Sequence, residues 1–265
     1  MSFAGKGINR RIRKRNHHSE RKQKMSFEID RGLLREQAAH LGINLDDAAL
    51  EKFSLVARML VEWNERINLT AITEPNEIVI KHFIDSLTVS SVLPKKEISL
   101  IDVGTGAGFP GVPLAIIRSD IKLTLLDSLN KRLIYLNELC GALEIKAALI
   151  HTRAEEAGQN EAFREKYDVA AARAVASLPV LCEYCLPFVK IGGRFIAMKG
   201  PEGETEAAVS ANAAGLLGGK LAHIEKTRLE TCAETMERRL LVFDKIEATP
   251  AKYPRITAKI KKQPL

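Results

Sequence analysis

The stretch Leu100–Gly111 reads Leu-Ile-Asp-Val-Gly-Thr-Gly-Ala-Gly-Phe-Pro-Gly and sets the architecture of the chain. The apolar run Ile98–Val103 has the length and β-branching of a short buried strand. Glycine then recurs at every second position, which predicts a tight turn whose backbone can approach a ligand closely: Gly104, Gly106 and Gly108. Pro113 and the apolar residues around it predict a helix directly after the turn. A strand, a glycine loop and a helix in this order are typical of a nucleotide-binding unit.

The loop lacks the features of phosphate-binding loops. Counted from Gly104, the dinucleotide fingerprint Gly-x-Gly-x-x-Gly needs its third glycine at position 109, which is Phe109. The Gly-Lys-Ser/Thr that ends a P-loop is also missing. The pattern Asp-x-Gly-x-Gly-x-Gly, with an acid one strand later at Asp127, resembles instead the first motifs of the S-adenosylmethionine-dependent methyltransferases, whose cofactor carries a sulfonium and no phosphate. The alternative at this point is a glycine turn in some other α/β enzyme.

Strands and helices alternate beyond the loop, and this alternation predicts parallel βαβ units. Four further strands are expected at Lys122–Leu126, Ala147–Ile150, Tyr167–Ala172 and Arg194–Lys199. Helices are expected between them at Leu129–Cys140 and at Leu178–Val189, the latter stopped by Gly192-Gly193, and then at Glu202–Leu217. Two last strands, Lys220–Arg228 and Arg238–Ile246, are expected to finish the sheet antiparallel. The fold class is therefore α/β, Rossmann-like, with a mostly parallel seven-stranded sheet.

An N-terminal helical appendage is expected before this sheet. Its helices are Phe27–Leu41, a longer one capped by Asp46 or Asp47, and one that contains Lys81–Leu87. We divide the chain into a basic disordered tail (1–24), the appendage (25–93), a methyltransferase domain (94–250) and a basic C-terminal segment (251–265), which is expected to be a coil.

Basic charge lies at the two ends of the chain. The net charge is +7, yet residues 1–24 alone contain nine lysines and arginines against one acid, and Lys252–Leu265 contains five with no acid. Basic ends favour a polyanionic partner, because each Lys or Arg that neutralises a phosphate releases a counterion. For residues 1–24 a solvated tail is the alternative. No run approaches the ~18 apolar residues of a membrane span, so we expect a cytoplasmic protein with no membrane partner.

Two sets of residues suggest catalytic or metal sites that the pattern does not support. Cys182 and Cys185 lie in an apolar helical stretch without a second ligand pair, so they are expected to be core thiols, and no metal is expected. His82, Asp85 and Ser86 are the residue types of a serine-hydrolase triad, but triad members come from separate elements. On one helix they are expected to make local hydrogen bonds or to line a neighbouring cleft.

Several stretches together resemble the ribosomal RNA small subunit methyltransferase G family, also called glucose-inhibited division protein B. The resemblance covers roughly Phe27 to Leu265. It rests on Trp63-Asn64, Asn68–Ile72, His82–Leu87, Asp102–Gly111, Leu126–Arg132, Ala172-Arg173-Ala174, Met198-Lys199-Gly200, Tyr253-Pro254-Arg255 and Lys262–Leu265. The glycine loop alone is shared by most methyltransferases, whereas the set is specific to this family.

The resemblance implies transfer of a methyl group from S-adenosylmethionine to N7 of one guanine in small-subunit (16S) ribosomal RNA. The cofactor-binding residues that carry over are Gly104, Gly106, Phe109, Asp127, Leu129, Ala154, Glu155 and Arg173. Asp127 is expected to bind the ribose, and Ala154 and Glu155 the adenine. Arg173 is expected to contact the cofactor or the target base, or else to form a structural ion pair.

The expected partner is small-subunit ribosomal RNA or a ribosomal particle, with the protein acting as a monomer. Candidate phosphate contacts are Lys131, Arg132, Lys199, Arg255 and the C-terminal lysines. Guanine N7 has a free lone pair and loses no proton on methylation, so no catalytic base is required, and none is assigned. Three alternatives stay open: a non-catalytic RNA-binding assembly factor, a small-molecule methyltransferase and, least favoured because of Phe109, a nicotinamide enzyme.

Overall fold

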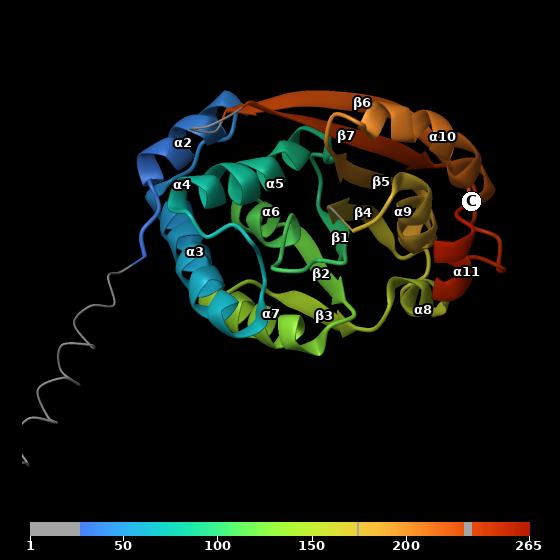
Figure 1. The fold of residues 1–265 in the computed structure, drawn as a ribbon, viewed down its shortest axis with the longest axis horizontal. Helices are drawn as coiled ribbons and strands as arrows, with labels where there is room; N and C mark the ends of the chain where they lie inside the picture. The colour runs from blue at the N-terminus through green and yellow to red at the C-terminus, as the bar shows by residue number, and fades with distance from the viewer. Residues whose placement is uncertain (1–26, 174, 231–234) are drawn as a thin grey trace, which may run out of the picture.

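A central seven-stranded sheet forms the core of the protein (Figure 1). The computed structural model describes residues 27–173, 175–230 and 235–265, so the expected basic tail lies outside the described residues. The strand order is β3-β2-β1-β4-β5-β7-β6. The strands are β1 (Ile98–Val103), β2 (Ile121–Asp127), β3 (Ala147–His151), β4 (Tyr167–Arg173), β5 (Val189–Lys199), β6 (Gly219–Glu230) and β7 (Thr235–Lys245).

The first five strands are parallel, whereas β7 pairs antiparallel with β5 and with β6. In this register Asp102 of β1 lies beside Leu125 of β2 and Ala171 of β4. The carboxyl ends of these strands therefore meet at one edge of the sheet, where α/β proteins bind ligands. The predicted Rossmann-like α/β fold with a mostly parallel seven-stranded sheet is confirmed.

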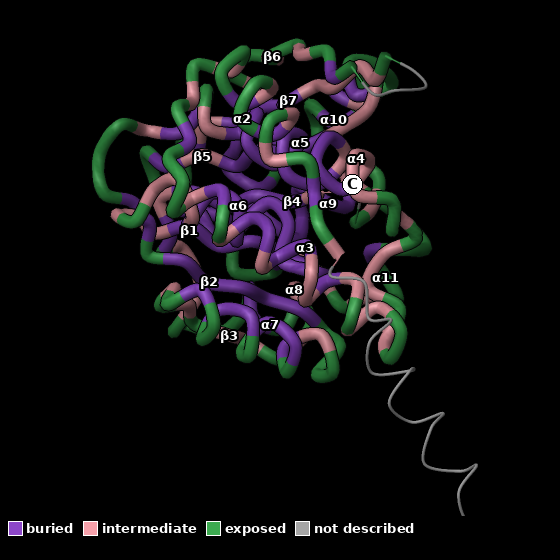
Figure 2. Tube along the Cα trace, turned by 90° about the vertical axis from the view of Figure 1, so that its left-hand side faces the viewer, coloured by how far each residue is buried: buried purple, intermediate pink, exposed green. Residues whose placement is uncertain are grey.

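Alternation along the strands divides the core into two hydrophobic clusters, one on each face of the sheet. Leu100 and Val169 belong to one cluster, and their neighbours Ile101 and Ala170 belong to the other. Because both faces are covered, the central strands are apolar at nearly every position. Figure 2 shows this buried centre with exposed connections around it.

The N-terminal helices cover the first face together with the helix that follows the glycine loop. They are α2 (Arg31–His40), α3 (Asp47–Ile67), α4 (Pro75–Ile78), a π-helical turn η1 (Val79–Ile84), α5 (Asp85–Leu87) and a 3-10 helix η2 (Thr88–Val92). Asp46 caps α3 by accepting a hydrogen bond from Ala49 N. One continuous cluster joins Leu34, Leu60 and Leu136, so these helices pack directly on the sheet layer.

The remaining helices connect the strands or follow the sheet. On the first face lie α6 (Gly111–Ile117) and α7 (Asn130–Leu143). The second face is covered by α8 (Ala154–Gln159), α9 (Leu178–Cys185), a 3-10 turn η3 (Leu186–Phe188) and α10 (Gly203–Leu216). The last helix, α11 (Thr257–Lys262), lies beside α8 and α9 (Figure 1).

The expected boundary at Gly192-Gly193 is wrong. The helix ends at Cys185, and β5 already begins at Val189, so the two glycines lie inside a strand. A Cβ at Gly193 would lie 2.6 Å from the carbonyl oxygen of Asp168, and the β4–β5 register shifts near this point. The glycines therefore permit a bulge and a close approach of two strands, not a helix stop.

The expected coil at the C-terminus is also corrected. Residues 257–262 form α11, and Ile260 is fully buried in the second cluster. Lysine-rich sequence indicated a solvated segment, but one apolar side chain on the inner side of the helix packs into the core and places the lysines around it.

Candidate cofactor and substrate site

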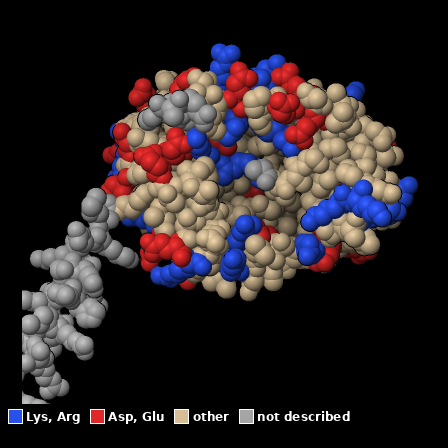
Figure 3. Space-filling view, viewed as in Figure 1, with Lys and Arg blue, Asp and Glu red and all other residues tan. Residues whose placement is uncertain are grey.

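A cavity of about 610 Å³ opens at the carboxyl ends of β1, β2 and β4. Figure 3 shows this face hollowed, with lysine and arginine side chains around the hollow. Most of the residues predicted to bind the cofactor line it, as does Arg132: Gly104, Gly106, Phe109, Asp127, Ala154, Glu155 and Arg173. Leu129 is not among the lining residues; the residue is 42% exposed, and its backbone N–H donates to Asp127.

The glycine loop forms one wall, but most of its N–H groups are bonded inside the protein. Gly104 N and Thr105 N donate to the carbonyl of Leu126 at 2.9 and 3.1 Å. Internal acceptors also take the N–H groups of residues 106, 108 and 109. These five N–H groups are used within the protein, so the loop offers a ligand its backbone surface rather than free donors. The glycines serve the turn itself, since φ is +72° at Gly104 and +60° at Gly106.

Asp127 ends β2 with a buried carboxylate, 2% exposed, that faces the cavity. Its Oδ2 accepts from Gly106 N at 3.0 Å and lies 3.2 Å from Arg132 Nη1. Its Oδ1 accepts from Leu129 N at 2.9 Å. A carboxylate has about four lone-pair sites, so Asp127 keeps acceptor capacity for a hydroxyl. Asp127 thus ties the glycine loop to the start of α7 and remains available to a ligand.

Asp102 is fully buried behind the loop and holds the loop's shape. Its Oδ2 accepts from Thr105 Oγ1 at 2.8 Å and from Gly111 N at 2.9 Å. Burial raises the pKa of this carboxyl to about 6, which the two hydrogen bonds oppose. Because Asp102 does not line the cavity, its role in this arrangement is to fix the turn between β1 and α6.

The C-terminal segment forms the opposite wall of the cavity. Glu155 is buried in the first turn of α8 and accepts a hydrogen bond from Thr257 Oγ1. Lys261 and Pro264 also line the cavity. Residues about a hundred positions apart therefore build the wall that contains Glu155.

A cluster centred on Arg173 closes the cavity beside Phe109. The Arg173 guanidinium donates to Asp85 Oδ2 at 3.1 Å, and its carbon lies 5.0 Å from the Phe109 ring centroid. His82 stacks on the same ring with centroids 4.7 Å apart. The ion-pair alternative for Arg173 is thus present in the structure, together with a place in the cavity wall.

The hydrogen-bond network assigns the tautomer of His82. Arg173 Nη2 lies 3.2 Å from Nδ1 of His82, and arginine is only a donor, so Nδ1 is the acceptor. Nε2 therefore carries the proton and donates to Thr70 Oγ1 at 2.9 Å. Burial and the neighbouring Arg173 charge lower the pKa of His82 to about 3. The imidazole is neutral at physiological pH, and both of its nitrogens are engaged.

Ser86 makes a local hydrogen bond and His82 lines the cavity, as predicted, whereas Asp85 forms long-range ion pairs. The Ser86 hydroxyl is fully buried and donates to the backbone carbonyl of His82 at 2.6 Å. Asp85 pairs with two arginines, Arg173 and Arg238. None of these contacts joins a serine hydroxyl to an imidazole nitrogen.

A second cavity of about 350 Å³ adjoins the first, and the two share His82 and Arg173 as lining residues. Its other lining residues are Ile72, Lys81, Asp85, Met198, Lys199, Gly200 and Arg238. Four of the nine lining residues are cationic and one is anionic, so the second cavity suits an electron-rich guest.

The four candidate phosphate contacts have different surroundings. Lys199 Nζ donates to Ala176 O at 2.7 Å and pairs with Glu206 at 2.8 Å. Arg255 forms a bidentate pair with Glu183, which is fully buried. Each of these two cations is paired with a carboxylate and has a side chain only 11% or 13% exposed, so neither is well placed to contact a phosphate. Arg132 is paired with Asp127, and Lys131 is exposed on α7.

Sequence reasoning missed part of the lining. Leu69, Thr70, Tyr184, Thr257 and Pro264 all face the first cavity without having been singled out as site residues. The Asn68–Ile72 and C-terminal stretches had matched the family pattern, and that match was the available signal. Nothing in the local sequence around Tyr184 distinguishes it from a core residue of α9.

The paired cysteines are buried core thiols, as expected. Cys182 and Cys185 are fully buried on α9, and burial raises the pKa of both thiols. Within residues 27–230 and 235–265, position 174 aside, no group of three or more His, Cys, Asp or Glu side chains could hold a metal ion. In the same part of the chain no helix is both long enough and apolar enough to cross a membrane. Cys232 lies outside the described residues.

Comparison with a protein-family model and with known relatives indicates a single family. Residues 49–237 match the family model described as rRNA small subunit methyltransferase G. Ribosomal RNA small subunit methyltransferase G of Acetivibrio thermocellus is 50% identical over 236 residues, covering 89% of this chain and 96% of the relative. The proteins of the same name from Alkaliphilus metalliredigens and Staphylococcus saprophyticus are 48% and 45% identical over 88% of this chain, covering 98% and 97% of those relatives. The chain belongs to the ribosomal RNA small subunit methyltransferase G family.

Proposed function

We propose that this protein transfers a methyl group from S-adenosylmethionine to N7 of a guanine in small-subunit ribosomal RNA. The observation that supports this most is the pair of adjoining cavities that share Arg173 and His82. The first has the glycine loop and the Asp127 carboxylate, and we assign it to the cofactor. The second has four cationic side chains in its lining, and we assign it to the target base. The shared wall is where the methyl group and N7 would meet.

The first cavity fits S-adenosylmethionine better than a phosphate-bearing nucleotide. Five loop N–H groups are satisfied internally, so the loop does not offer the anion-binding nest of a P-loop. Asp127 retains acceptor sites for ribose hydroxyls, and Glu155 stands at the next strand end, where it can accept from an adenine amino group. When bound, S-adenosylmethionine supplies an electrophilic methyl group on a sulfonium.

The chain's part in the reaction is positioning. Guanine N7 attacks through a free lone pair and releases no proton, so the step needs no general base. The nearest imidazole, His82, is neutral and has both nitrogens engaged, which agrees with this requirement. Holding two reactants in line supplies several kcal/mol of the barrier reduction, on the order of 7 kcal/mol or more for well-oriented groups.

The proposed partner is ribosomal RNA, free or in a small-subunit particle. Lys131 and the exposed lysines of α11 are the proposed phosphate contacts, and we place the protein in the cytoplasm as a monomer. Each phosphate contact adds to the salt dependence of RNA binding.

The test uses purified protein, radiolabelled S-adenosylmethionine and small ribosomal subunits, or their extracted RNA, from cells that lack this methylation. We expect label in the RNA at a guanine that is sensitive to N7-directed strand cleavage. Cofactor binding without transfer would favour a non-catalytic assembly factor. RNA affinity that does not depend on salt, again without transfer, would favour a small-molecule methyltransferase.

A further inference from the structure

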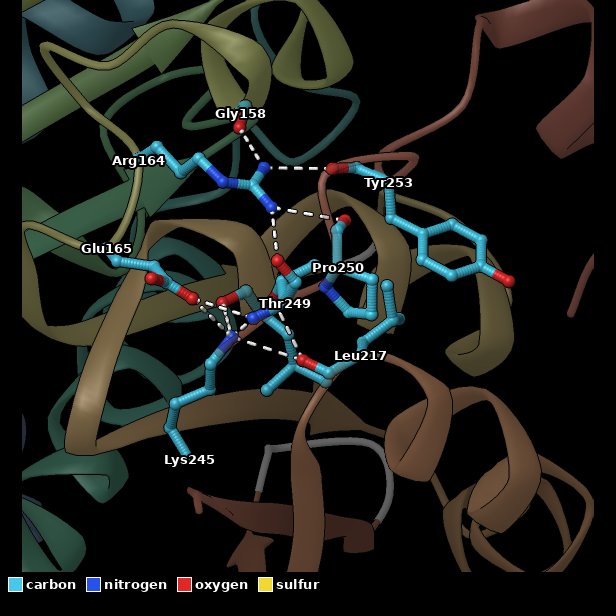
Figure 4. Close-up of polar contacts among 9 residues, drawn as sticks. Gly158, Arg164, Glu165, Leu217, Lys245, Thr249, Pro250 and Tyr253 are labelled. Carbon is cyan, nitrogen blue, oxygen red and sulfur yellow. Dashed lines mark hydrogen bonds and ion pairs between the residues drawn. The ribbon is translucent and has the colours of Figure 1, made fainter. Parts of the chain in front are cut away.

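Arg164, in the loop between α8 and β4, holds the chain's last segment by its backbone (Figure 4). Its guanidinium donates to the carbonyls of Gly158 and Tyr253, both at 2.8 Å, and to those of Thr249 at 2.6 Å and Pro250 at 3.2 Å. All four partners are main-chain oxygens, so this contact positions the segment whatever side chains it carries.

The next residue, Glu165, contacts the same part of the segment, at Thr249. Its Oε1 accepts from Thr249 N at 2.7 Å and lies 3.4 Å from Nζ of Lys245. Lys245 is almost completely buried and also donates to Leu186 O and Leu217 O. Thr249 is thus hydrogen-bonded through its carbonyl oxygen to Arg164 and through its N–H to Glu165. Glu165 has a φ of +52°, a conformation that side-chain-bearing residues hold only when their surroundings require it.

From this anchor the chain runs to the cofactor cavity. We call residues 249–265 the C-terminal strap. Gln159 donates to Ala251 O and Pro254 O, and the strap then pairs with Glu183 through Arg255. Thr257 follows with its hydrogen bond to Glu155, and Lys261 and Pro264 end the strap in the cavity wall.

We propose that Arg164 and Glu165 are positioning residues for the cofactor cavity and act through the C-terminal strap. The inference rests on the proposed use of this cavity for S-adenosylmethionine. Neither residue lines the cavity. The strap has one six-residue helix and few buried apolar side chains, so its location depends on polar anchors. Loosening the anchor displaces Thr257 and frees Glu155 to turn from the geometry that receives the cofactor.

The primary variants are Arg164→Met and Glu165→Gln, and the readout is the dissociation constant of S-adenosylhomocysteine measured by calorimetry. We expect binding at least tenfold weaker in each, with KM for S-adenosylmethionine raised by the same factor and kcat within twofold of wild type. Arg164→Lys keeps a cation that can donate to up to three carbonyls, so it should recover part of the affinity.

Arg118→Met is the matched control. Arg118 also donates to main-chain carbonyls, those of Pro94 at 3.1 Å and Lys96 at 2.9 Å. These contacts lie at the amino ends of the strands, away from the cavity. It should lower the melting temperature as Arg164→Met does while leaving cofactor affinity unchanged.

A double-mutant cycle tests whether Arg164 acts on the cavity through Thr257 of the strap. If Arg164 acts through the strap, Arg164→Met combined with Thr257→Val should weaken cofactor binding no more than the stronger single variant does. Fully additive effects, or equal losses in Arg164→Met and Arg118→Met, would overturn the inference. Wild-type protein that binds cofactor but does not methylate ribosomal RNA would overturn the proposed function alone. Wild-type protein that binds no cofactor would overturn both.

Discussion

Nη2 of Arg173 lies 3.2 Å from Nδ1 of His82, and this contact fixes the tautomer of an imidazole whose pKa is lowered by burial and by the arginine charge. The arginine also lies over the Phe109 ring on which His82 stacks. A permanent positive charge so close to a buried imidazole disfavours its protonation. The shared wall of the two cavities therefore carries one fixed cation, contributed by Arg173, and one neutral ring.

The first prediction concerns the effect of acid on His82. Its folded-state pKa of about 3 lies below the value of about 6.5 expected in the unfolded chain, so the unfolded chain binds more protons between these values. Stability that His82 contributes at pH 7 is therefore lost as the pH falls through this window. Urea unfolding at pH 7.5 and 5.0 should show the advantage of wild type over His82→Gln shrinking by on the order of 2 kcal/mol. A difference that stays constant with pH would contradict the assigned environment.

The second prediction concerns Asp127 and the cofactor. Asp127→Asn removes the charge. It also places an amide N–H₂ opposite one of the two backbone N–H groups from which the carboxylate accepts hydrogen bonds. The bonds at stake for the ligand are the two proposed ones from the ribose hydroxyls to the Asp127 carboxylate. Losing two hydrogen bonds to a charged group costs about 3 kcal/mol, so the dissociation constant of S-adenosylhomocysteine should rise roughly a hundredfold.

Asp120→Asn is the control for this change, because Asp120 is paired with Arg118 outside the cavity. Calorimetry should show it binding like wild type. If both variants bind within threefold of wild type, Asp127 is not the ribose acceptor.

The third prediction concerns the buried pair Arg255–Glu183. Arg255→Met leaves a fully buried carboxylate without its cation, which should lower the free energy of unfolding by about 3 kcal/mol or more. Adding Glu183→Gln removes the stranded charge and should restore more than half of this loss. The measurement is equilibrium unfolding in urea.

The exposed pair Arg35–Asp47 gives the comparison, since Arg35→Met should cost less than about 1 kcal/mol. Equal costs for Arg35→Met and Arg255→Met would show that Arg255 is as solvated as the sequence suggested.

The fourth prediction separates two lysines proposed from sequence as phosphate contacts. Lys131 is exposed, so Lys131→Gln should weaken RNA binding at low salt and reduce the slope of log affinity against log salt by about 1. Lys199 is committed to Ala176 and Glu206, so Lys199→Gln should lower the melting temperature and leave the slope unchanged. Filter binding over a salt series measures both slopes. Swapped behaviour of the two variants would reverse these assignments.

The sequence by itself determined the sheet, the glycine loop and the edge at which the cavity opens. Strand Ile98–Val103 and the antiparallel finish could be predicted because burial imposes a local pattern of apolar residues. The place of Asp127 at a strand end followed from the same pattern. Parallel strands then bring such ends together, so most of the residues predicted to bind the cofactor do line the cavity.

Only the tertiary structure decided which charged groups face the cavity and which are bonded internally. Arg255 and Glu183 are 72 positions apart, and Thr257 and Glu155 are 102 apart, and no local pattern records either contact. The same holds for the grip of Arg164 and Glu165 on Thr249. A charged side chain in a polar stretch of sequence is predicted to be solvated. It becomes a buried anchor only when folding brings its partner within hydrogen-bond distance and removes the water around both.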